Sequence, residues 1–176
     1  VLTFDGRGAA AFWNRQALAG WLVENLGLKN VVVKARRATG AQPSAAAATG
    51  PTVLAGTLPE EIVILENGVK FSVNISRGQK TGFFLDQRDN RRRLRDISTP
   101  GTATLNTFAY TGSFSVVAAL ASAVTTTLDL SQPYLDWTRE NFRLNRIDPD
   151  TQYFVKGDTF HWLRRFAKQG RTFTGI

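Results

Sequence analysis

The sequence contains no cysteine and no methionine, and its single histidine is His161. Without cysteine the chain can form no disulfide, no thiolate metal site and no cysteine nucleophile. The absence of cysteine fits a reducing compartment, so we expect a cytoplasmic protein. His161 has no cysteine or second histidine with which to share a metal, and we expect no metal site. Because the chain begins at Val1 and lacks methionine, we interpret it as part of a longer polypeptide.

No apolar run is long enough to span a bilayer, and the first residues do not form a signal-peptide pattern. Positive charge is in excess, with 22 Lys and Arg against 14 Asp and Glu and a formal net charge of +8. Such a surplus favours a polyanionic partner. RNA fits better than a membrane, because no basic amphipathic helix stands out. The alternative is that the charge only keeps the protein in solution.

Residues 1–60 are predicted to form a small α+β region. Residues 5–8 have the composition of a turn, and apolar spacing over 10–26 predicts a single amphipathic helix. The three valines at 31–33 indicate a strand. Alanine, threonine, glycine, serine and proline dominate 38–50, which predicts a flexible loop.

Residues 61–98 begin with a predicted β-hairpin. The Asn67-Gly68 pair between two apolar runs is the strongest short turn signal, because both positions tolerate positive φ. Apolar and polar residues alternate over 69–75, which predicts that Ser72 and Asn74 face water.

A polar loop and an arginine-rich helix complete this region. We expect Asp86 to be the N-cap of a helix that runs through Arg95. The arginines of this helix are either a solvated face or contacts for phosphates or a ligand carboxylate. Arg88 lies nearest the polar loop and is the arginine that we favour as functional.

Residues 99–176 alternate between predicted strands and helices, which argues for a parallel, doubly wound α/β sheet that is incomplete at its C-terminal end. The predicted elements are strands at 103–107, 124–129 and 152–156, helices at 112–121, 133–145 and 159–168, and a strand that has just begun at 172–176.

Two acidic residues and a glycine mark the expected ligand-binding edge of this sheet. Gly112 opens the first helix, where a glycine lets the backbone approach a ligand closely. Asp129 stands 17 residues later at a strand end, near the spacing of a ribose-binding carboxylate, and Asp158 ends the next strand. One glycine does not make a dinucleotide fingerprint and suits a smaller adenosyl ligand. A structural turn with a solvent-facing Asp129 is the alternative.

Several blocks of the sequence resemble one family, the class I S-adenosylmethionine-dependent methyltransferases of the large-subunit ribosomal RNA type. That family includes cytosine-C5 and guanine-N7 enzymes. The resemblance is strong over 62–176 and weak before it. The blocks that carry it are 66–68, 79–91, 108–115, 129–131, 139–145 and 157–158.

The resemblance implies a Rossmann-like methyltransferase core with S-adenosylmethionine as its cofactor. Lys80 and Thr81 would then lie near the methionine end of the cofactor, and Arg88 would be a candidate for its carboxylate. The backbone turn against the cofactor would be formed by Phe108, Ala109, Tyr110 and Gly112.

The same resemblance implies the contacts to the adenosyl group. Asp129 would hold the ribose hydroxyls, since two acceptor oxygens meet two donors, and Leu130 follows it in the same block. Asp158 would accept from the adenine amino group, with Thr159 and Phe160 alongside.

Members of the family continue past this endpoint into an Asp-Pro-Pro-type motif that faces the target base. We therefore expect the catalytic residues to lie outside this chain and assign none within it. The leading hypothesis is a methyltransferase that acts on RNA, with 23S ribosomal RNA as the expected substrate. The first alternative is a catalytically inactive RNA-binding module that retains the fold. The second is a nucleotide-dependent oxidoreductase, against which the missing glycines count.

Overall fold

The computed structural model describes residues 1–4, 6–34 and 50–175. The chain divides into two compact units, which are described separately. Unit 1 comprises Val1–Ile62 and Val73–Phe84, and unit 2 comprises Val63–Ser72 and Leu85–Ile176. Apart from Gly50, the loop predicted at 38–50 lies outside the described residues. Among the described residues, no helix is long and apolar enough to cross a membrane.

The described residues of unit 1 form two helices beside a two-stranded antiparallel sheet, and the single helix predicted for 10–26 is wrong. The Asn14 side chain accepts from the Ala17 N–H at 3.0 Å and starts a second helix there. Gly6 and Gly8 of the predicted turn are helical, and Asp5 is outside the described residues. The elements are α1 (Gly6–Phe12), α2 (Arg15–Leu26), β1 (Val31–Val33) and β2 (Thr52–Ala55).

The predicted hairpin is confirmed as β3 (Ile62–Glu66) and β4 (Val69–Val73). Asn67 and Gly68 have φ values of 50° and 79°, as a tight hairpin turn requires. The prediction that Ser72 and Asn74 face water is wrong, because both are buried. The Ser72 backbone is bonded to side chains of a helix, and the Asn74 Oδ1 accepts from the Arg77 N–H. The Asn74 Nδ2 has no hydrogen-bond partner among the described residues, so the burial of this amide is compensated only in part.

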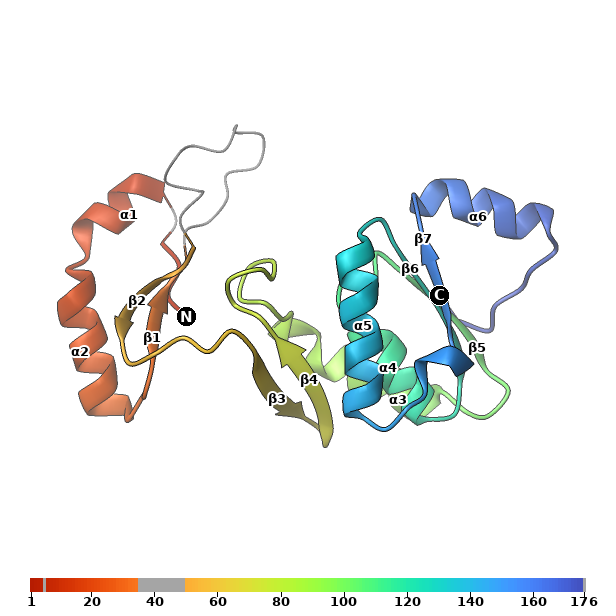
Figure 1. Ribbon diagram of the computed structural model, residues 1–176, viewed down its shortest axis with the longest axis horizontal. Helices are drawn as coiled ribbons and strands as arrows, with labels where there is room; N and C mark the ends of the chain where they lie inside the picture. Colours follow the sequence, from red (N-terminus) through yellow and green to blue (C-terminus); the bar gives the residue numbers. More distant parts are fainter. Residues whose placement is uncertain (5, 35–49, 176) are drawn as a thin grey trace. The chain divides into compact units, whose positions relative to one another are not determined.

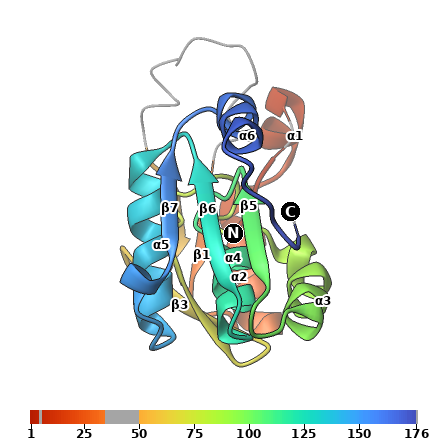
Figure 2. The same ribbon diagram turned by 90° about the vertical axis from the view of Figure 1, so that its right-hand side faces the viewer.

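The C-terminal half of unit 2 is built on a three-stranded parallel sheet in the order β5-β6-β7 (Figure 2). The strands are β5 (Ala103–Thr107), β6 (Val124–Asp129) and β7 (Tyr153–Lys156). Gly175 forms a parallel bridge with Thr104 on the free side of β5, where the sequence predicted a strand that had just begun. The Rossmann-like α/β fold is therefore confirmed.

Helices cover both faces of this sheet (Figures 1 and 2). Side chains alternate between the faces of a strand, and in β6 Thr127 meets α4 while Leu128 joins Leu105 and Phe166 of α6 in an apolar core. α4, α5 and α6 follow β5, β6 and β7 in turn, and a short 3-10 helix precedes β7. Their bounds are α4 (Ser113–Leu120), α5 (Gln132–Leu144), η3 (Pro149–Thr151) and α6 (Thr159–Lys168).

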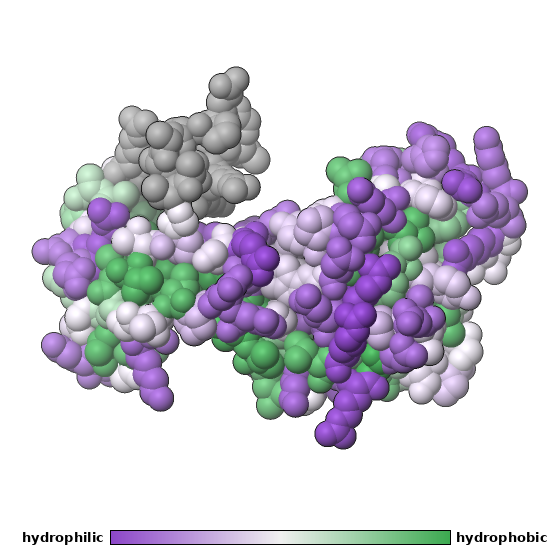
Figure 3. Space-filling view, in the orientation of Figure 1, coloured by the Kyte–Doolittle hydropathy of each residue, from purple (hydrophilic) through white to green (hydrophobic). Residues whose placement is uncertain are grey.

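The position of α5 follows from its amphipathic sequence. Leu135, Thr138 and Phe142 are spaced for one helical face and are buried. The opposite face is exposed, with Glu140 and Arg143 among its side chains. Figure 3 shows a strongly hydrophilic surface in the region of α5.

The arginine-rich segment forms η2 (Leu85–Gln87) and α3 (Arg88–Ile97). Asp86 is not the N-cap as predicted, because it lies inside η2 and the helix starts after Gln87 without a side-chain cap. Arg91 is almost fully buried and makes two bonds to the Glu66 carboxylate, from Nε at 2.6 Å and from Nη2 at 2.8 Å. This bidentate ion pair fastens the hairpin to α3.

We predict that Arg91→Ala or Glu66→Ala lowers the free energy of unfolding by about 3–5 kcal/mol, because either change leaves a buried charge without its partner. Urea denaturation of the chain measures the loss. Arg93→Ala is the matched control on the same helix, where the side chain is exposed, and should change stability by no more than about 0.5 kcal/mol. Equal effects at 91 and 93 would contradict the structural role of the ion pair.

Candidate functional site

The candidate site lies at the carboxyl end of β5, where the order of the strands reverses. From β5 the chain proceeds outward to β6 and β7, and it then returns to the other side of β5, where Gly175 O accepts from the Leu105 N–H at 2.9 Å. Open α/β sheets bind ligands at such a switch point, outside the carboxyl ends of the strands.

The turn from β5 into α4 has an unusual backbone. Phe108, Tyr110 and Gly112 have φ values of 53°, 52° and 69°. For the two residues that are not glycine, a left-handed conformation costs about 1–2 kcal/mol each. Strain of this kind persists only where surrounding groups hold it, and it is concentrated at functional sites.

Asp129 is one of the groups that hold the turn. Its Oδ2 accepts from the Tyr110 N–H at 2.8 Å, and its Oδ1 accepts from the Ser131 N–H at 2.9 Å. The carboxylate is half-buried at the end of β6, and each oxygen is oriented by one backbone donor. A carboxylate has about four acceptor positions, so each oxygen has capacity for a further donor.

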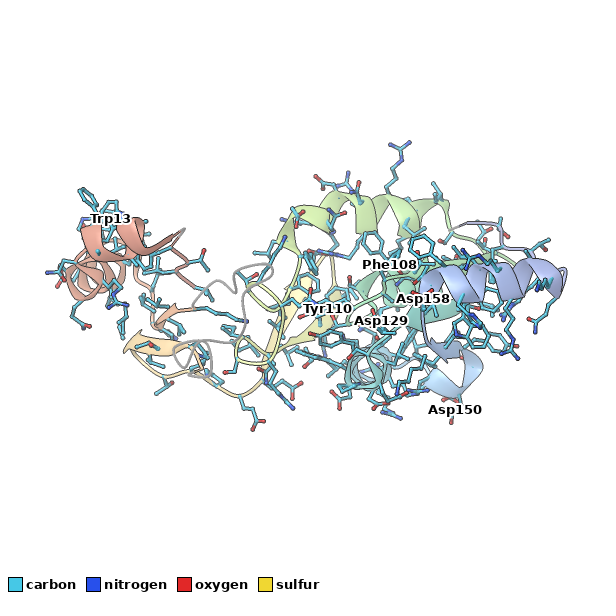
Figure 4. All side chains as sticks on the ribbon, turned by 90° about the horizontal axis from the view of Figure 1, so that it is seen from above. Trp13, Phe108, Tyr110, Asp129, Asp150 and Asp158 are labelled. Carbon is cyan, nitrogen blue, oxygen red and sulfur yellow. The ribbon has the colours of Figure 1, made fainter. Side chains whose placement is uncertain are left out.

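The next strand end brings a second carboxylate beside the first. The Gly157 N–H donates to the Asp129 carbonyl at 3.0 Å, which places Asp158 next to that strand end. Asp158 Oδ1 accepts from the His161 N–H at 2.8 Å and caps α6, while Thr159 is buried. Figure 4 shows Phe108, Tyr110, Asp129 and Asp158 together at this edge, whereas Asp150 lies apart.

Exposed apolar side chains accompany the two carboxylates. The rings of Phe108 and Phe160 meet edge to face with centroids 6.2 Å apart. Both residues are nevertheless exposed, Phe108 to 67% and Phe160 to 61%. Leu130 is also exposed, at 72%. Large apolar groups at the mouth of a switch point provide surface for a flat, apolar part of a ligand.

Gly112 is required for a reason that the sequence did not reveal. A Cβ at this position would lie 2.1 Å from Thr138 Cγ2 and 2.6 Å from Thr138 Oγ1. Glycine is therefore needed at 112 because α5 packs closely against the turn there. The expected ligand contact at this glycine stays a prediction.

Three polar side chains join β5, α4 and β6 beneath the turn. Asn106 Nδ2 donates to Ser115 Oγ at 2.9 Å, and Thr127 Oγ1 donates to the same oxygen at 2.8 Å. Ser115 and Thr127 are fully buried, so these bonds fix the start of α4 against both strands. This network was not predicted from the sequence, although a polar residue at position 106, within a partly buried strand, was a signal for it.

The Tyr110 side chain is buried against α5. Its ring lies 4.6 Å from the ring of Tyr134 and 6.3 Å from that of Trp137, between centroids. The Tyr110 N–H therefore binds the Asp129 carboxylate, while the Tyr110 ring packs the turn against α5.

The remaining predicted residues lie on other elements. Arg88 is the exposed first residue of α3 in unit 2. Lys80 and Thr81 belong to unit 1, where Lys80 Nζ lies 5.1 Å from the centre of the Phe84 ring and Thr81 Oγ1 donates to the Phe83 carbonyl at 2.9 Å. Their roles at the methionine end stay predictions. In the part of the chain that the structure describes, no group of three or more His, Cys, Asp and Glu could hold a metal ion.

The fold is that of a Rossmann-like α/β domain with a candidate ligand site at this edge, and comparisons with known proteins give the family. The family model for S-adenosylmethionine-dependent methyltransferases matches residues 32–173. This match covers most of the sequence, and the chain belongs to that family, whose cofactor is S-adenosylmethionine.

Curated relatives include enzymes named for ribosomal RNA. The chain is 43% identical over 119 residues to ribosomal RNA large subunit methyltransferase K of Neisseria meningitidis, covering 67% of this chain and 33% of the relative. It is 42% identical over 125 residues to ribosomal RNA large subunit methyltransferase I of Pseudoalteromonas atlantica, covering 70% and 31%. The chain thus spans about a third of the length of the curated relatives it matches.

Solved structures share the fold. A structure assigned to a methyltransferase and complexed with SAH is 30% identical with a TM-score of 0.74, covering 89% of this chain and 39% of that chain. The SAM-dependent methyltransferase from Agrobacterium tumefaciens is 25% identical with a TM-score of 0.64, covering 70% and 40%.

We predict that Gly112→Ala destabilises the chain more than Gly101→Ala does. Both glycines have positive φ, which costs an alanine about 1–2 kcal/mol. Only the Cβ at 112 meets another residue, since nothing lies within 4 Å of one at 101. Overpacking against Thr138 should add about 1–3 kcal/mol, which urea denaturation of both variants measures. Equal losses would show that the turn can move away from α5.

Proposed function

We propose that this chain binds S-adenosylmethionine at the carboxyl edge of its parallel sheet and serves a methyltransferase that acts on RNA. In this proposal residues 99–176 form the cofactor-binding core, residues 61–98 lead into it, and residues 1–60 are a separate α+β region. The observation that carries the proposal is the Asp129 carboxylate, whose two oxygens are oriented by the Tyr110 and Ser131 N–H groups beside the switch point.

The residues at this edge fit an adenosyl group. Each oxygen of Asp129 retains acceptor capacity, as the two ribose hydroxyls require. Phe108, Leu130 and Phe160 offer exposed apolar surface for the adenine, and Asp158 stands beside them as the acceptor for its amino group. The turn of Phe108, Ala109, Tyr110 and Gly112 would lie against the cofactor. Lys80, Thr81 and Arg88 would hold its methionine end.

When bound, the cofactor would supply an electrophilic methyl group on its sulfonium for transfer to a nucleophilic atom of the acceptor base. The residues of this chain would bind and orient that cofactor. They are assigned no proton transfer and no contact to the acceptor.

The proposed acceptor is a base of large-subunit ribosomal RNA. The names of the curated relatives and the net charge of +8 support this choice. A base must be unstacked or single-stranded before an enzyme pocket can reach it. The family resemblance implies cytosine C5 or guanine N7 as the atom that is methylated. A cytoplasmic location belongs to the same proposal.

We predict that the chain binds S-adenosylhomocysteine and not NAD, and that Asp129→Asn raises the dissociation constant at least about tenfold. The loss of a charge-assisted acceptor is worth about 1.5–3 kcal/mol, and the new amide would oppose the donors that now orient the carboxylate. Calorimetric titration measures both. Asp150→Asn is the matched control in the same unit, away from the edge (Figure 4), and should leave binding unchanged. Selective NAD binding would instead favour the oxidoreductase alternative.

We also predict that the protein, extended to the length of its curated relatives, transfers a labelled methyl group from S-adenosylmethionine to unmodified 23S ribosomal RNA. Asp129→Ala should abolish most of this transfer, because the cofactor no longer binds. Scintillation counting of the recovered RNA measures it. RNA binding without any transfer, indifferent to S-adenosylhomocysteine, would instead establish the inactive RNA-binding module.

A further inference from the structure

One edge of the hairpin is satisfied by side chains of α5 instead of by another strand. Asn145 Oδ1 accepts from the Lys70 N–H at 2.9 Å, and its Nδ2 donates to the Lys70 carbonyl at 2.7 Å. Asn141 Oδ1 accepts from the Ser72 N–H at 2.8 Å, and Trp137 Nε1 donates to the Ser72 carbonyl at 3.1 Å. Because positions four apart lie on one helical face, 137, 141 and 145 form a row along β4.

Asn141 differs from the other two because it continues to the candidate site. Its Nδ2 donates to the Thr111 carbonyl at 2.9 Å, so the two ends of one amide join β4 to the turn between β5 and α4. Both Asn141 and Thr111 are almost completely buried, so water cannot replace these bonds. Thr111 lies between Tyr110 and Gly112, two of the three residues at positive φ.

We propose that Asn141 is a positioning residue for cofactor binding. This inference rests on the proposed function of the edge. By fixing the Thr111 carbonyl, Asn141 holds the turn in the conformation that points the Tyr110 N–H at Asp129. At its other end it fixes the Ser72 N–H of β4.

The chemistry of the amide explains why asparagine is needed. One bond requires an acceptor and the other a donor, and an amide offers both on a short, rigid group. An apolar residue of the same size would fill the space but would leave the Ser72 N–H and the Thr111 carbonyl without partners. The turn could then relax from its strained conformation, and Asp129 would lose the donor that orients Oδ2.

The test compares Asn141→Ala with Asn145→Ala. Asn145 makes the same kind of bonds to β4, one further bond to the Asn141 carbonyl within α5, and none to the turn, so it controls for the loss of hairpin docking. Each variant is titrated with S-adenosylhomocysteine in a calorimeter at a temperature where circular dichroism shows it to be folded. Lower global stability does not change affinity there, since nearly all molecules remain native. We expect Asn141→Ala to raise the dissociation constant at least about tenfold and Asn145→Ala by less than about threefold.

Asn141→Leu keeps the number and branching of the side-chain heavy atoms and is the second variant if the alanine variant does not fold. We expect the same weakening of at least about tenfold from it. Equal dissociation constants for folded variants at 141 and 145 would overturn the positioning role while leaving the proposed function intact. Failure of the unsubstituted chain to bind S-adenosylhomocysteine would overturn the proposed function, and the positioning role with it.

Discussion

The structure of the site depends on one backbone constraint, which is that the turn between β5 and α4 holds three residues at positive φ within five positions. Only Gly112 adopts that conformation without strain, so the turn exists because other groups stabilise it. The Asp129 carboxylate binds the Tyr110 N–H, and Asn141 binds the Thr111 carbonyl. The same contacts that stabilise the turn therefore orient the carboxylate on which the site depends. A change that disorders the turn would therefore also disorder the Asp129 carboxylate.

Helix α5 imposes the second constraint, and it does so with polar contacts. Apolar burial is not directional, so a hairpin held only by Val69 and Phe71 could slide along a helix. The bonds of Asn141 and Asn145 to Ser72 and Lys70 remove that freedom because each joins one backbone group to one side-chain atom. The bond between Asn141 and Ser72 is buried, so a shift in register would be costly because it would leave a buried backbone donor unpaired. Helix α5 thus positions both the hairpin and the turn.

The parts of the fold that could be predicted from the sequence are those determined by neighbouring residues. Strands β5 and β6 and helix α6 have the predicted bounds, because apolar periodicity and turn chemistry act over a few positions. The failures concern distant partners. The alternating pattern predicts that Ser72 faces water, yet its backbone is hydrogen-bonded to side chains of α5, about seventy residues away in the sequence. Arg91 is one of several arginines predicted to form either a solvated helix face or contacts to a ligand, yet it forms a buried pair with Glu66. At the site, the spacing of Gly112, Asp129 and Asp158 indicated the edge, but nothing local indicated that Thr138 requires the glycine and Asn141 holds the turn.

Because the packing of α5 accounts for Gly112, the single glycine in this turn does not by itself indicate which ligand binds. In a dinucleotide fingerprint the glycines serve the approach to a pyrophosphate as well as packing, whereas here the one glycine is accounted for by α5. The charge at this edge of the sheet instead distinguishes between a dinucleotide and an adenosyl ligand. Residues 108–112, 129–131 and 157–160 contain two carboxylates and neither lysine nor arginine. Two negative groups beside exposed Phe108, Leu130 and Phe160 disfavour phosphates and favour a ligand that combines a neutral base and ribose with positive charge. S-adenosylmethionine, with its sulfonium and ammonium groups, is such a ligand, and a pyrophosphate-linked nucleotide is not.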